Sequence, residues 1–294
     1  MTADTGTPQH ADTRTGIAGH TTGTHPHTHT ATLPEAEAPG TALITGGTSG
    51  IGLAVAETLG ELGHRVFLCS RHEDEVRTVV DKLRGRGVQA DGVRADVTDR
   101  ADVTALVQAC VAAFGPIAVL VNNAGRGGGG ITAELTDELW DDVIATNLTS
   151  VFRVTREVLA RGGMLERGAG RVINIASTGG KQGVVFAAPY SASKHGVIGF
   201  TKALGLELAQ SGVTVNAVCP GYVETPMAER VRQGYAAHWG TTTEDVLARF
   251  QAKIPLGRYA SPREVAAMVA YLAGPAAAAV TAQALNVCGG LGNY

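Results

Sequence analysis

The segment PYSASKHGVIGF, residues 189–200, places a tyrosine four residues before a lysine. On a helix, Tyr190 and Lys194 would share one face, about one turn apart. A phenol has an ordinary pKa of about 10, so it is a poor proton donor near neutral pH. A lysine cation nearby favours the phenolate and lowers that pKa. The pair therefore indicates proton transfer to or from a bound substrate.

Two further polar residues are placed to join this pair. Ser177 ends the apolar run 171–177, and parallel sheets bind ligands beyond the carboxyl ends of their strands. Asn147 lies inside a helical pattern and indicates a local kink or a water site. With a cofactor that carries a hydride, Ser177 would hold a ketone, Tyr190 would protonate its oxygen, and Lys194 would keep the phenol acidic and hold the nicotinamide ribose. Asn147 would anchor the water that returns the proton.

A glycine-rich turn indicates where such a cofactor would bind. The sequence TGGTSGIG, residues 45–52, directly follows an apolar run and opens a helical pattern. Gly46 permits a tight turn, and Gly50 and Gly52 allow backbone to approach a pyrophosphate at the helix N-terminus. The predicted cofactor contacts in this turn are Gly46, Thr48, Ser49, Gly50, Ile51 and Gly52.

The end of the second predicted strand distinguishes two dinucleotides. NAD-binding versions of this arrangement place an acidic residue there to hold the ribose hydroxyls. This chain has Ser70 and Arg71 instead, and a guanidinium binds a 2′-phosphate that a carboxylate would repel. The sequence therefore predicts NADP(H). Asp96, after the third strand, is placed to bind the adenine, and the run NNAG, residues 122–125, brings small residues to the ribose.

The elements that must position these residues alternate along the chain. Buried parallel strands are indicated at 41–45, 65–69, 118–125, 171–177, 213–220 and 284–287, with a weaker one at 88–96. Helical windows lie between them at 50–62, 73–86, 99–114, 136–161, 190–211 and 262–273. This alternation predicts an α/β fold, a single-domain Rossmann-type doubly wound parallel sheet of about seven strands with helices on both faces.

One segment interrupts the alternation. Residues 224–256 form a long insertion that we expect to contain two helices broken at GTTT. Long excursions on the ligand side of such sheets are often substrate walls. Met227, Tyr235, Trp239 and Phe250 would line a pocket or simply pack together, and the sequence leaves both interpretations open.

Composition excludes several classes of protein. The 294 residues are 44% hydrophobic with a net charge of −3, which gives no sign of a nucleic-acid or anionic-membrane surface. No apolar run approaches the roughly 20 residues of a membrane span. Cysteines lack metal spacing, which favours reduced thiols in a cytoplasmic protein and no metal site. The four cysteines are Cys69, Cys110, Cys219 and Cys288.

Residues 1–39 differ from the rest of the chain. They are rich in Thr, Gly and His, with almost no large apolar residue, and we expect them to be disordered. They contain no apolar stretch of the kind a secretory signal needs. The stretch HPHTH, residues 25–29, could bind a divalent metal weakly, although an extension with incidental affinity is the simpler interpretation. The folded domain is expected to span residues 40–294.

The motifs TGGTSGIG, NNAG and YSASK, with Asn147 and Ser177, resemble the signature of the short-chain dehydrogenases/reductases across residues 41–294. ASTGGKQGVVFAAPYSASK, VNAVCPGYVETPM and AAAAVTAQALNVCGGLGNY are similar to the ketoreductases of type II aromatic polyketide synthases. That resemblance implies NADPH-dependent reduction of one ketone, typically at C9, of a polyketide tethered to an acyl carrier protein in antibiotic biosynthesis. It also implies a homotetramer.

The resemblance extends to individual residues. It implies further cofactor contacts from Val97, Asn123, Ala124, Gly125, Pro220, Gly221, Val223 and Thr225, besides Tyr190 and Lys194. It implies substrate contacts from Gly127, Gly128, Gly129, Thr178, Gln182, Val184, Met227 and Tyr235.

One position in the substrate loop departs from the family pattern. Gly127 stands where the family has proline, in a loop that is tied there to the face of the ketone that is reduced. We expect reduction of the same face, because Gly128 and Gly129 remain. The preceding Arg126 could attract the anionic arm of a carrier protein, or be an ordinary surface arginine.

Two other functions fit the same motifs. A 3-oxoacyl-carrier-protein reductase of fatty-acid synthesis performs this chemistry on a linear substrate, which a rigid bicyclic ketone would distinguish. A non-catalytic NADP(H) sensor could use the same scaffold. A sensor has no need of a proton donor paired with a cation, so Tyr190 and Lys194 favour the enzyme.

Overall fold

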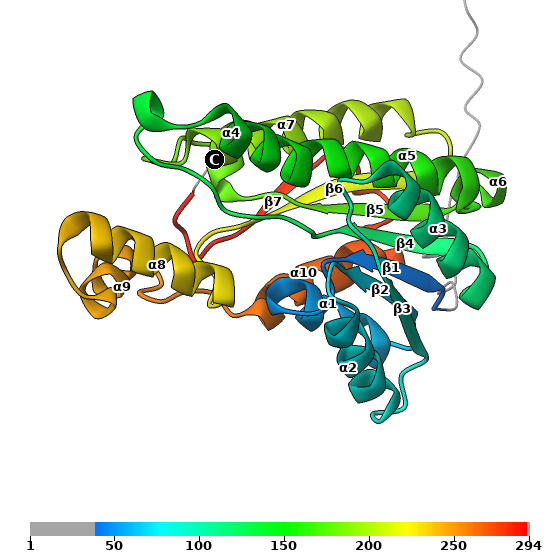
Figure 1. Cartoon of the computed structure of the whole chain (residues 1–294). Coiled ribbons are helices and arrows are strands. Elements are labelled where there is room, and N and C mark those ends of the chain that lie inside the picture. The colour runs from blue at the N-terminus through cyan, green and yellow to red at the C-terminus, as the bar shows by residue number, and fades with distance from the viewer. Residues whose placement is uncertain (1–38, 293–294) are drawn as a thin grey trace, which may run out of the picture. The chain divides into compact units, whose positions relative to one another are not determined.

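Seven parallel strands form a single sheet in the order β3-β2-β1-β4-β5-β6-β7 (Figure 1). The computed structural model describes residues 39–292, and the predictions for residues 1–38, including the histidine stretch, lie outside the described residues. The strands are β1 (Thr41–Thr45), β2 (Arg65–Ser70), β3 (Ala90–Arg94), β4 (Ile117–Asn122), β5 (Gly170–Ile175), β6 (Val213–Pro220) and β7 (Ala284–Val287).

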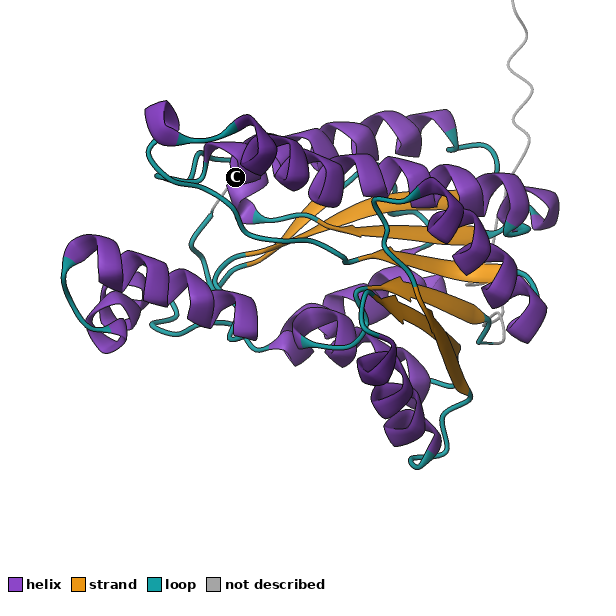
Figure 2. Ribbon diagram, in the orientation of Figure 1, coloured by secondary structure: helices purple, strands orange, loops and turns teal. Residues whose placement is uncertain are grey.

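Helices cover both faces of this sheet (Figure 2). One face carries α1 (Gly50–Glu61), α2 (Glu73–Arg84) and α10 (Pro262–Ala273), and the other carries α3 (Arg100–Phe114), α5 (Ser150–Arg161) and α7 (Ala188–Glu207). The predicted doubly wound Rossmann-type fold is therefore confirmed.

The central strand shows why the apolar runs are continuous rather than alternating. Ala42 and Ile44 of β1 pack into the core that contains α1 and α10, whereas Leu43 packs into the opposite core with α3. All three side chains are fully buried. A strand that is covered on both faces requires apolar residues at every position, which is the pattern of TALIT.

The strand order reverses beside β1, and this reversal locates the ligand side. The chain runs from β1 outward to β2 and β3, then returns to β4 and continues to the other edge. A crevice opens at the carboxyl ends of the strands on the two sides of such a reversal. Thr45, Ser70, Asn122, Ile175 and Pro220 are the last residues of their strands, and they lead into the predicted site segments.

The predicted helix at 136–161 is broken into three pieces. α4 (Asp137–Ile144) passes into a π-helical turn at Ala145–Thr149, and α5 begins at Ser150. A π turn holds one extra residue in a helix and is frequent at functional sites. Asn147 lies in this turn, so the predicted local kink is confirmed.

Three strand predictions extended too far. The strands predicted at 118–125 and 171–177 end at Asn122 and Ile175, and the one predicted at 88–96 covers only Ala90–Arg94. The Ala176 amide still donates to the Val218 carbonyl of β6, so one ladder bond continues past β5 before the chain turns toward the ligand side.

The insertion contains the two predicted helices, α8 (Pro226–Trp239) and α9 (Thr243–Gln251). Gly240 ends α8 with a left-handed φ of +61°, and Thr242 caps α9 by accepting a hydrogen bond from the Asp245 amide. Both helices lie beyond the carboxyl ends of the strands (Figure 1).

An aromatic cluster holds this insertion to the body of the domain. Tyr222, just after β6, stacks on Phe250 of α9 with ring centroids 4.8 Å apart and on Tyr259 at 5.2 Å. Tyr235 and Trp239 of α8 contact the same Phe250 ring. These residues therefore pack together, and packing accounts for Phe250, which is buried.

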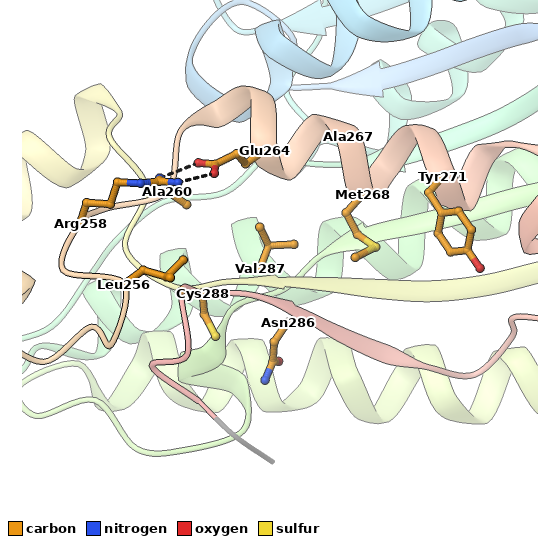
Figure 3. Close-up of a pocket in the computed structure, with 11 residues that line it drawn as sticks. Leu256, Arg258, Ala260, Glu264, Ala267, Met268, Tyr271, Asn286, Val287 and Cys288 are labelled. Atoms are coloured by element: carbon orange, nitrogen blue, oxygen red, sulfur yellow. Dashed lines mark hydrogen bonds and ion pairs between the residues drawn. The ribbon is translucent and has the colours of Figure 1, made fainter.

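A cavity of about 500 Å³ lies between α10 and β7, at the edge of the sheet (Figure 3). Leu256, Met268 and Tyr271 contribute apolar surface to it, and an Arg258–Glu264 ion pair borders it. Within residues 39–292, no helix has both the length and the hydropathy to cross a membrane.

Candidate active site

The glycine turn between β1 and α1 depends on two left-handed backbone conformations and one close approach of backbone. Gly46 and Gly50 have φ values of +64° and +53°, which residues other than glycine rarely adopt. A Cβ on Gly52 would lie 2.1 Å from the Gly46 carbonyl oxygen. Glycine is therefore required at Gly46 and Gly50 for backbone conformation and at Gly52 for space.

Asn123 fixes this turn from the neighbouring strand. Its Nδ2 donates to the carbonyl oxygens of Thr45 and Gly46, at 3.0 and 2.8 Å. In return, the Thr45 hydroxyl accepts from the amides of Asn123 and Ala124, both at 3.1 Å. Asn123 was predicted only as one of the small residues near the cofactor ribose. Its side chain also holds the glycine turn in place.

The N-terminus of α1 is open to an anion. Ser49 is the N-cap, but its side chain makes no capping hydrogen bond, so it leaves the first N–H groups of the helix available to a ligand. The helix dipole also favours negative charge at this end. A glycine-rich turn, followed by a helix without a side-chain cap, fits the pyrophosphate of a dinucleotide.

The segment after β6 forms the opposite wall. A Cβ on Gly50 would lie 3.3 Å from Cγ2 of Thr225, so the two segments are in contact range. Thr225 also caps α8 by accepting from the Ala228 amide. Pro220 ends β6, Gly221 donates its amide to Val287, and Val223 is buried. Of the predicted residues of this segment, Thr225 thus lies beside the glycine turn, and cofactor contacts from Pro220, Gly221 and Val223 stay predictions.

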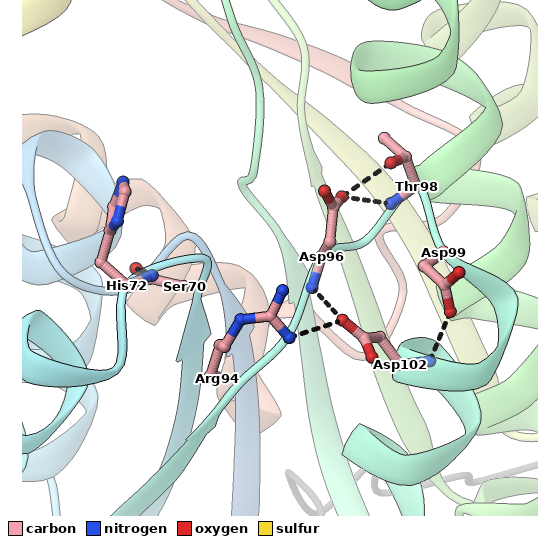
Figure 4. A network of polar contacts seen from close by, with 7 residues as sticks. All are labelled: Ser70, His72, Arg94, Asp96, Thr98, Asp99 and Asp102. Carbon is pink, nitrogen blue, oxygen red and sulfur yellow. Dashed lines mark hydrogen bonds and ion pairs between the residues drawn. The ribbon is translucent and has the colours of Figure 1, made fainter.

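Asp96 follows β3 in a network of polar contacts (Figure 4). Its carboxylate accepts from the amide and the hydroxyl of Thr98, at 2.9 and 2.7 Å, and its own amide donates to Asp102. Partial burial acts to raise the pKa of Asp96, but the Thr98 hydrogen bonds and the charges of Arg71 and Arg94 outweigh it and lower that pKa. The carboxylate is thereby held charged and oriented. Val97, next to it, is buried.

Ser177 and Tyr190 meet on the ligand side, as predicted. Ser177 is the N-cap of a short 3₁₀ turn, and its Oγ accepts from the Gly179 amide at 3.0 Å. Tyr190 is the third residue of α7 and shares a side-chain hydrogen bond with Ser177. Two hydroxyls in contact at this edge can bind one carbonyl oxygen together.

Lys194 is buried, one turn along α7 from Tyr190. Its Nζ donates to the Ile175 carbonyl at 2.8 Å and lies 5.9 Å from the centre of the Tyr190 ring. Burial lowers the pKa of this amine to about 8. The side chain therefore sits between the end of β5 and the tyrosine, as the i and i+4 spacing predicted.

The expected direction of the Tyr190 pKa is wrong in this structure. Sequence analysis expected Lys194 to lower it, but burial raises it, and the hydrogen bond with Ser177 only partly opposes that rise. The physical reason is that desolvation of the phenol is the largest effect, and the neighbouring Cys219 adds to the rise in the pKa. Tyr190 is consequently a protonated donor at neutral pH.

Asn147 holds the backbone beside this lysine. Its Oδ1 accepts from the Arg126 amide at 2.8 Å, and its Nδ2 donates to the Arg126 carbonyl at 2.9 Å and to Ser193 at 3.1 Å. A Cβ on Gly125 would lie 3.2 Å from Oδ1 of Asn147 and 3.7 Å from Nζ of Lys194. Asn147 therefore positions residues 125–126 against Lys194, and its role with a water stays a prediction.

The loop of Gly127, Gly128 and Gly129 packs against the segment before α7. A Cβ on Gly129 would lie 1.9 Å from the Phe186 carbonyl oxygen, which also accepts from the Gly130 amide at 2.8 Å. A Cβ on Gly128 would meet Val143 at 2.3 Å, whereas one on Gly127 meets nothing within 4 Å. Gly127 is thus the one glycine of the three that has room for a larger residue.

Of the other predicted substrate residues, the structure gives contacts near the site for Val184 and Tyr235 only. Val184 lies near Ser177 and Tyr190, since a Cβ on Gly179 would contact all three. Tyr235 reaches from α8 to donate its hydroxyl to the Val185 carbonyl at 2.8 Å. Thr178 is buried, Gln182 is exposed, and Met227 is half-buried on α8, so a contact with substrate stays a prediction for these residues.

Arg126 is engaged within the chain. Its guanidinium pairs with Asp142 of α4, and its Nε donates to the Gly127 carbonyl at 3.1 Å. A carrier-protein arm would therefore have to compete with Asp142 for this side chain.

Several residues that shape the site were not singled out by sequence analysis. Thr45, Ser193 and Thr98 act through hydrogen bonds to predicted residues, and Glu75 accepts from the hydroxyls of Thr48 and Ser70. Thr45 and Ser193 lay in quoted motifs, but Thr98 and Glu75 carried no signal of their own. Within residues 39–292, no group of three or more His, Cys, Asp or Glu side chains is arranged to hold a metal ion.

Comparison with known families agrees with this geometry. Residues 40–236 match the family described as short chain dehydrogenase. The chain belongs to the short-chain dehydrogenase family. It is accordingly an oxidoreductase, and the sensor alternative is set aside.

Its relatives include proteins named as polyketide ketoreductases. A Streptomyces coelicolor protein named as a ketoacyl reductase is 67% identical over 253 residues, which is 86% of this chain and 97% of the relative. A Streptomyces violaceoruber protein named as a ketoacyl reductase of the granaticin polyketide synthase is 63% identical over 270 residues, which is 90% of this chain and 99% of the relative. The FabG 3-oxoacyl-[acyl-carrier-protein] reductase of Escherichia coli is 38% identical over 250 residues, which is 85% of this chain and 96% of the relative.

A solved structure gives the same assignment. The crystal structure of a tryptophan variant of actinorhodin polyketide ketoreductase with NADPH has a TM-score of 0.85 and 66% sequence identity to this chain, covering 87% of this chain and 98% of that one. The predicted resemblance to polyketide ketoreductases is therefore confirmed.

The Gly52 contact predicts a defect in cofactor binding. In Gly52→Ala the added Cβ must displace the Gly46 carbonyl, so we expect the affinity for NADPH to fall at least about tenfold. Fluorescence titration with NADPH measures this. Gly234→Ala on α8 is the control, because its Cβ would meet nothing within 4 Å. Equal affinities in the two variants would contradict the assignment of this turn.

The buried lysine predicts a pH dependence. Because the pKa of Lys194 is lowered to about 8, its amine is charged below that pH and becomes neutral above it. The pKa of Tyr190 is raised, so the phenol stays protonated over the same range. We expect kcat/KM for ketone reduction to fall as pH rises through about 8. Recovery of activity on return to neutral pH excludes unfolding, and a flat profile to about pH 10 would show that the lysine charge is not needed.

Proposed function

We propose that this chain is an NADPH-dependent ketoreductase of polyketide biosynthesis. It reduces one ketone, at C9, of an aromatic polyketide that is bound to an acyl carrier protein, in the production of an antibiotic. The observation that carries the proposal is the contact of Ser177 and Tyr190 beside buried Lys194, at the strand edge that also holds the glycine turn. The 66% identity to a ketoreductase solved with NADPH supports the choice of substrate class and cofactor.

The residues for NADPH lie along one continuous edge. With NADPH bound, the amides after Gly50 would hold the pyrophosphate, Asp96 the adenine, and Ser70 and Arg71 the 2′-phosphate. Asn123, Ala124 and Gly125 would lie beside the ribose, and Thr225, which lies across from Gly50, would bound the other side. When bound, this cofactor supplies the hydride that reduces the ketone.

The side chains of the site then handle the carbonyl oxygen and its proton. Ser177 and Tyr190 donate hydrogen bonds to the oxygen, which gains negative charge as the ketone is reduced. Tyr190 releases its proton to that oxygen, and the cation of Lys194 stabilises the phenolate that remains. Asn147 keeps residues 125–126 against Lys194, so the lysine faces the tyrosine and the ribose together.

The proposed assembly is a homotetramer in the cytoplasm. Exposed apolar side chains on two parts of the surface favour it: Trp140 of α4 and Phe152 of α5 on one, and Tyr271 and Leu256, which border the cavity at β7, on the other. Two different self-complementary faces on one chain generate a tetramer with twofold axes. The four cysteines are buried and free, which suits a reducing compartment.

Replacing the proton donor tests the function. With the bicyclic ketone trans-1-decalone as substrate, Tyr190→Phe should lose at least about 100-fold in kcat/KM, because it lacks the acidic hydroxyl. NADPH absorbance measures the rate. The matched control is Tyr259→Phe, which removes a hydroxyl but keeps the ring that stacks on Tyr222, and it should retain most of the activity.

Three outcomes decide between the candidates. Turnover of the bicyclic ketone by the wild type and its loss in Tyr190→Phe support the proposal. Turnover of linear 3-oxoacyl substrates alone would favour the fatty-acid reductase, to which the identity is only 38%. Retention of activity in Tyr190→Phe would contradict the role of this tyrosine.

Gly127 provides a test of stereochemistry. Its Cβ position is open, so Gly127→Pro can be made without a clash at Cβ, and it fixes φ in the loop beside Phe186. We expect both chains to give the same alcohol configuration, because Gly128 and Gly129 keep the loop packed. Chiral chromatography of the product measures this. Opposite configurations would show that residue 127 selects the face of the ketone.

A further inference from the structure

A carboxylate lies between a hydroxyl of the glycine turn and that of Ser70, which is expected to face the 2′-phosphate. Glu75 is in the first turn of α2, and its Oε2 accepts from Thr48 Oγ1 at 2.9 Å and from Ser70 Oγ at 3.3 Å. Thr48 comes from the glycine turn and Ser70 from the end of β2, so one carboxylate oxygen joins the two segments. The Ser70 hydroxyl also accepts from the His72 amide at 3.1 Å, which fixes its oxygen in place.

The same hydroxyls are suited to a phosphate. Hydroxyl donors serve phosphate oxygens as well as carboxylate oxygens, and Arg71 adjoins Ser70 in sequence. A 2′-phosphate held by Thr48, Ser70 and Arg71 must therefore take the hydrogen bonds that Glu75 now accepts. Glu75 is exposed, so its side chain is free to rotate away, but its charge stays close to the phosphate.

The charges around this position do not neutralise Glu75. Among residues 39–292, Glu75 has no ion pair with a lysine or arginine. Arg94 is engaged by Asp102 at 3.3 Å, and the charge of Arg71 also acts on Asp96. The charge of Arg71 is thus already shared with Asp96 before any phosphate binds.

We propose that Glu75 is a specificity-determining residue that weakens binding of the 2′-phosphate and so narrows the preference of this chain for NADPH over NADH. The inference rests on the proposed function, since it concerns the same cofactor edge. It assigns to Glu75 the opposite effect to Arg71: the guanidinium attracts the phosphate, and the carboxylate competes with it for hydroxyls and repels its charge.

Binding of two nucleotides isolates this effect from catalysis. Isothermal titration calorimetry of the full chain compares adenosine 2′,5′-bisphosphate with adenosine 5′-monophosphate, which lacks the 2′-phosphate. Glu75→Gln and Glu75→Ala should bind the bisphosphate about fivefold more tightly than the wild type, and the monophosphate within about twofold. The gain should shrink in about 0.5 M salt, because exposed charges are screened.

Glu73→Gln is the matched control. It removes the same charge from the same helical turn, at a residue that does not contact Thr48 or Ser70. An equal gain in Glu73→Gln would show a general charge effect and overturn the proposal. Unchanged or weaker bisphosphate binding in both Glu75 variants would also overturn it, since the carboxylate would then be a spectator or a support for the hydroxyls.

A separate titration keeps the two proposals apart. Fluorescence titration of the wild type with NADPH tests the proposed function directly. Absence of NADPH binding would overturn that function, and the role of Glu75 with it. Clear NADPH binding together with unchanged Glu75 variants would overturn only the role of Glu75.

Discussion

The ligand side of this protein depends on the contact between the ends of β1 and β4. Asn123 donates to the carbonyls of Thr45 and Gly46, and the Thr45 hydroxyl accepts from the amides that follow β4. These bonds tie the glycine turn to the strand across the reversal of the sheet. The same segment continues through Gly125 to Arg126, whose backbone is held by Asn147. The cofactor cradle and the catalytic lysine are thus joined through one short segment, from Asn122 to Arg126.

Burial sets the chemistry of the catalytic pair. Lys194 is 5% exposed, and it is anchored by the Ile175 carbonyl rather than by a carboxylate. Desolvation lowers its pKa and raises that of Tyr190, so each group shifts toward its neutral form. At neutral pH the phenol is protonated and Lys194, with a pKa of about 8, is still mostly charged, so Tyr190 can give its proton to an oxyanion while the lysine cation stabilises the phenolate. The electrostatic character of the site is therefore a property of the packed interior as much as of the residue pair.

Local patterns in the sequence predicted much of this arrangement. The glycine turn, the continuous apolar strands and the i and i+4 pair are each defined within a few residues, so periodicity and spacing are sufficient for them. The direction of the Tyr190 pKa was wrong because burial depends on how α7 packs on the sheet. The contact of Glu75 with Thr48 was missed because the two residues lie 27 positions apart in the sequence. The side-chain role of Asn123 was missed because Thr45 and Gly46 lie 78 and 77 positions away. Such contacts are set by topology, which a single sequence does not display.

The π-helical turn between α4 and α5 has a consequence for how the two helices are oriented. Each residue advances an α-helix by about 100°, so one extra residue rotates everything before it relative to everything after it. The face that α5 buries through Val154 and Val158 is therefore rotated by a fixed offset from the face that an unbroken helix would continue from α4. That offset lets Asn147 turn its side chain toward Arg126 and Ser193 while Val154 and Val158 stay in the core.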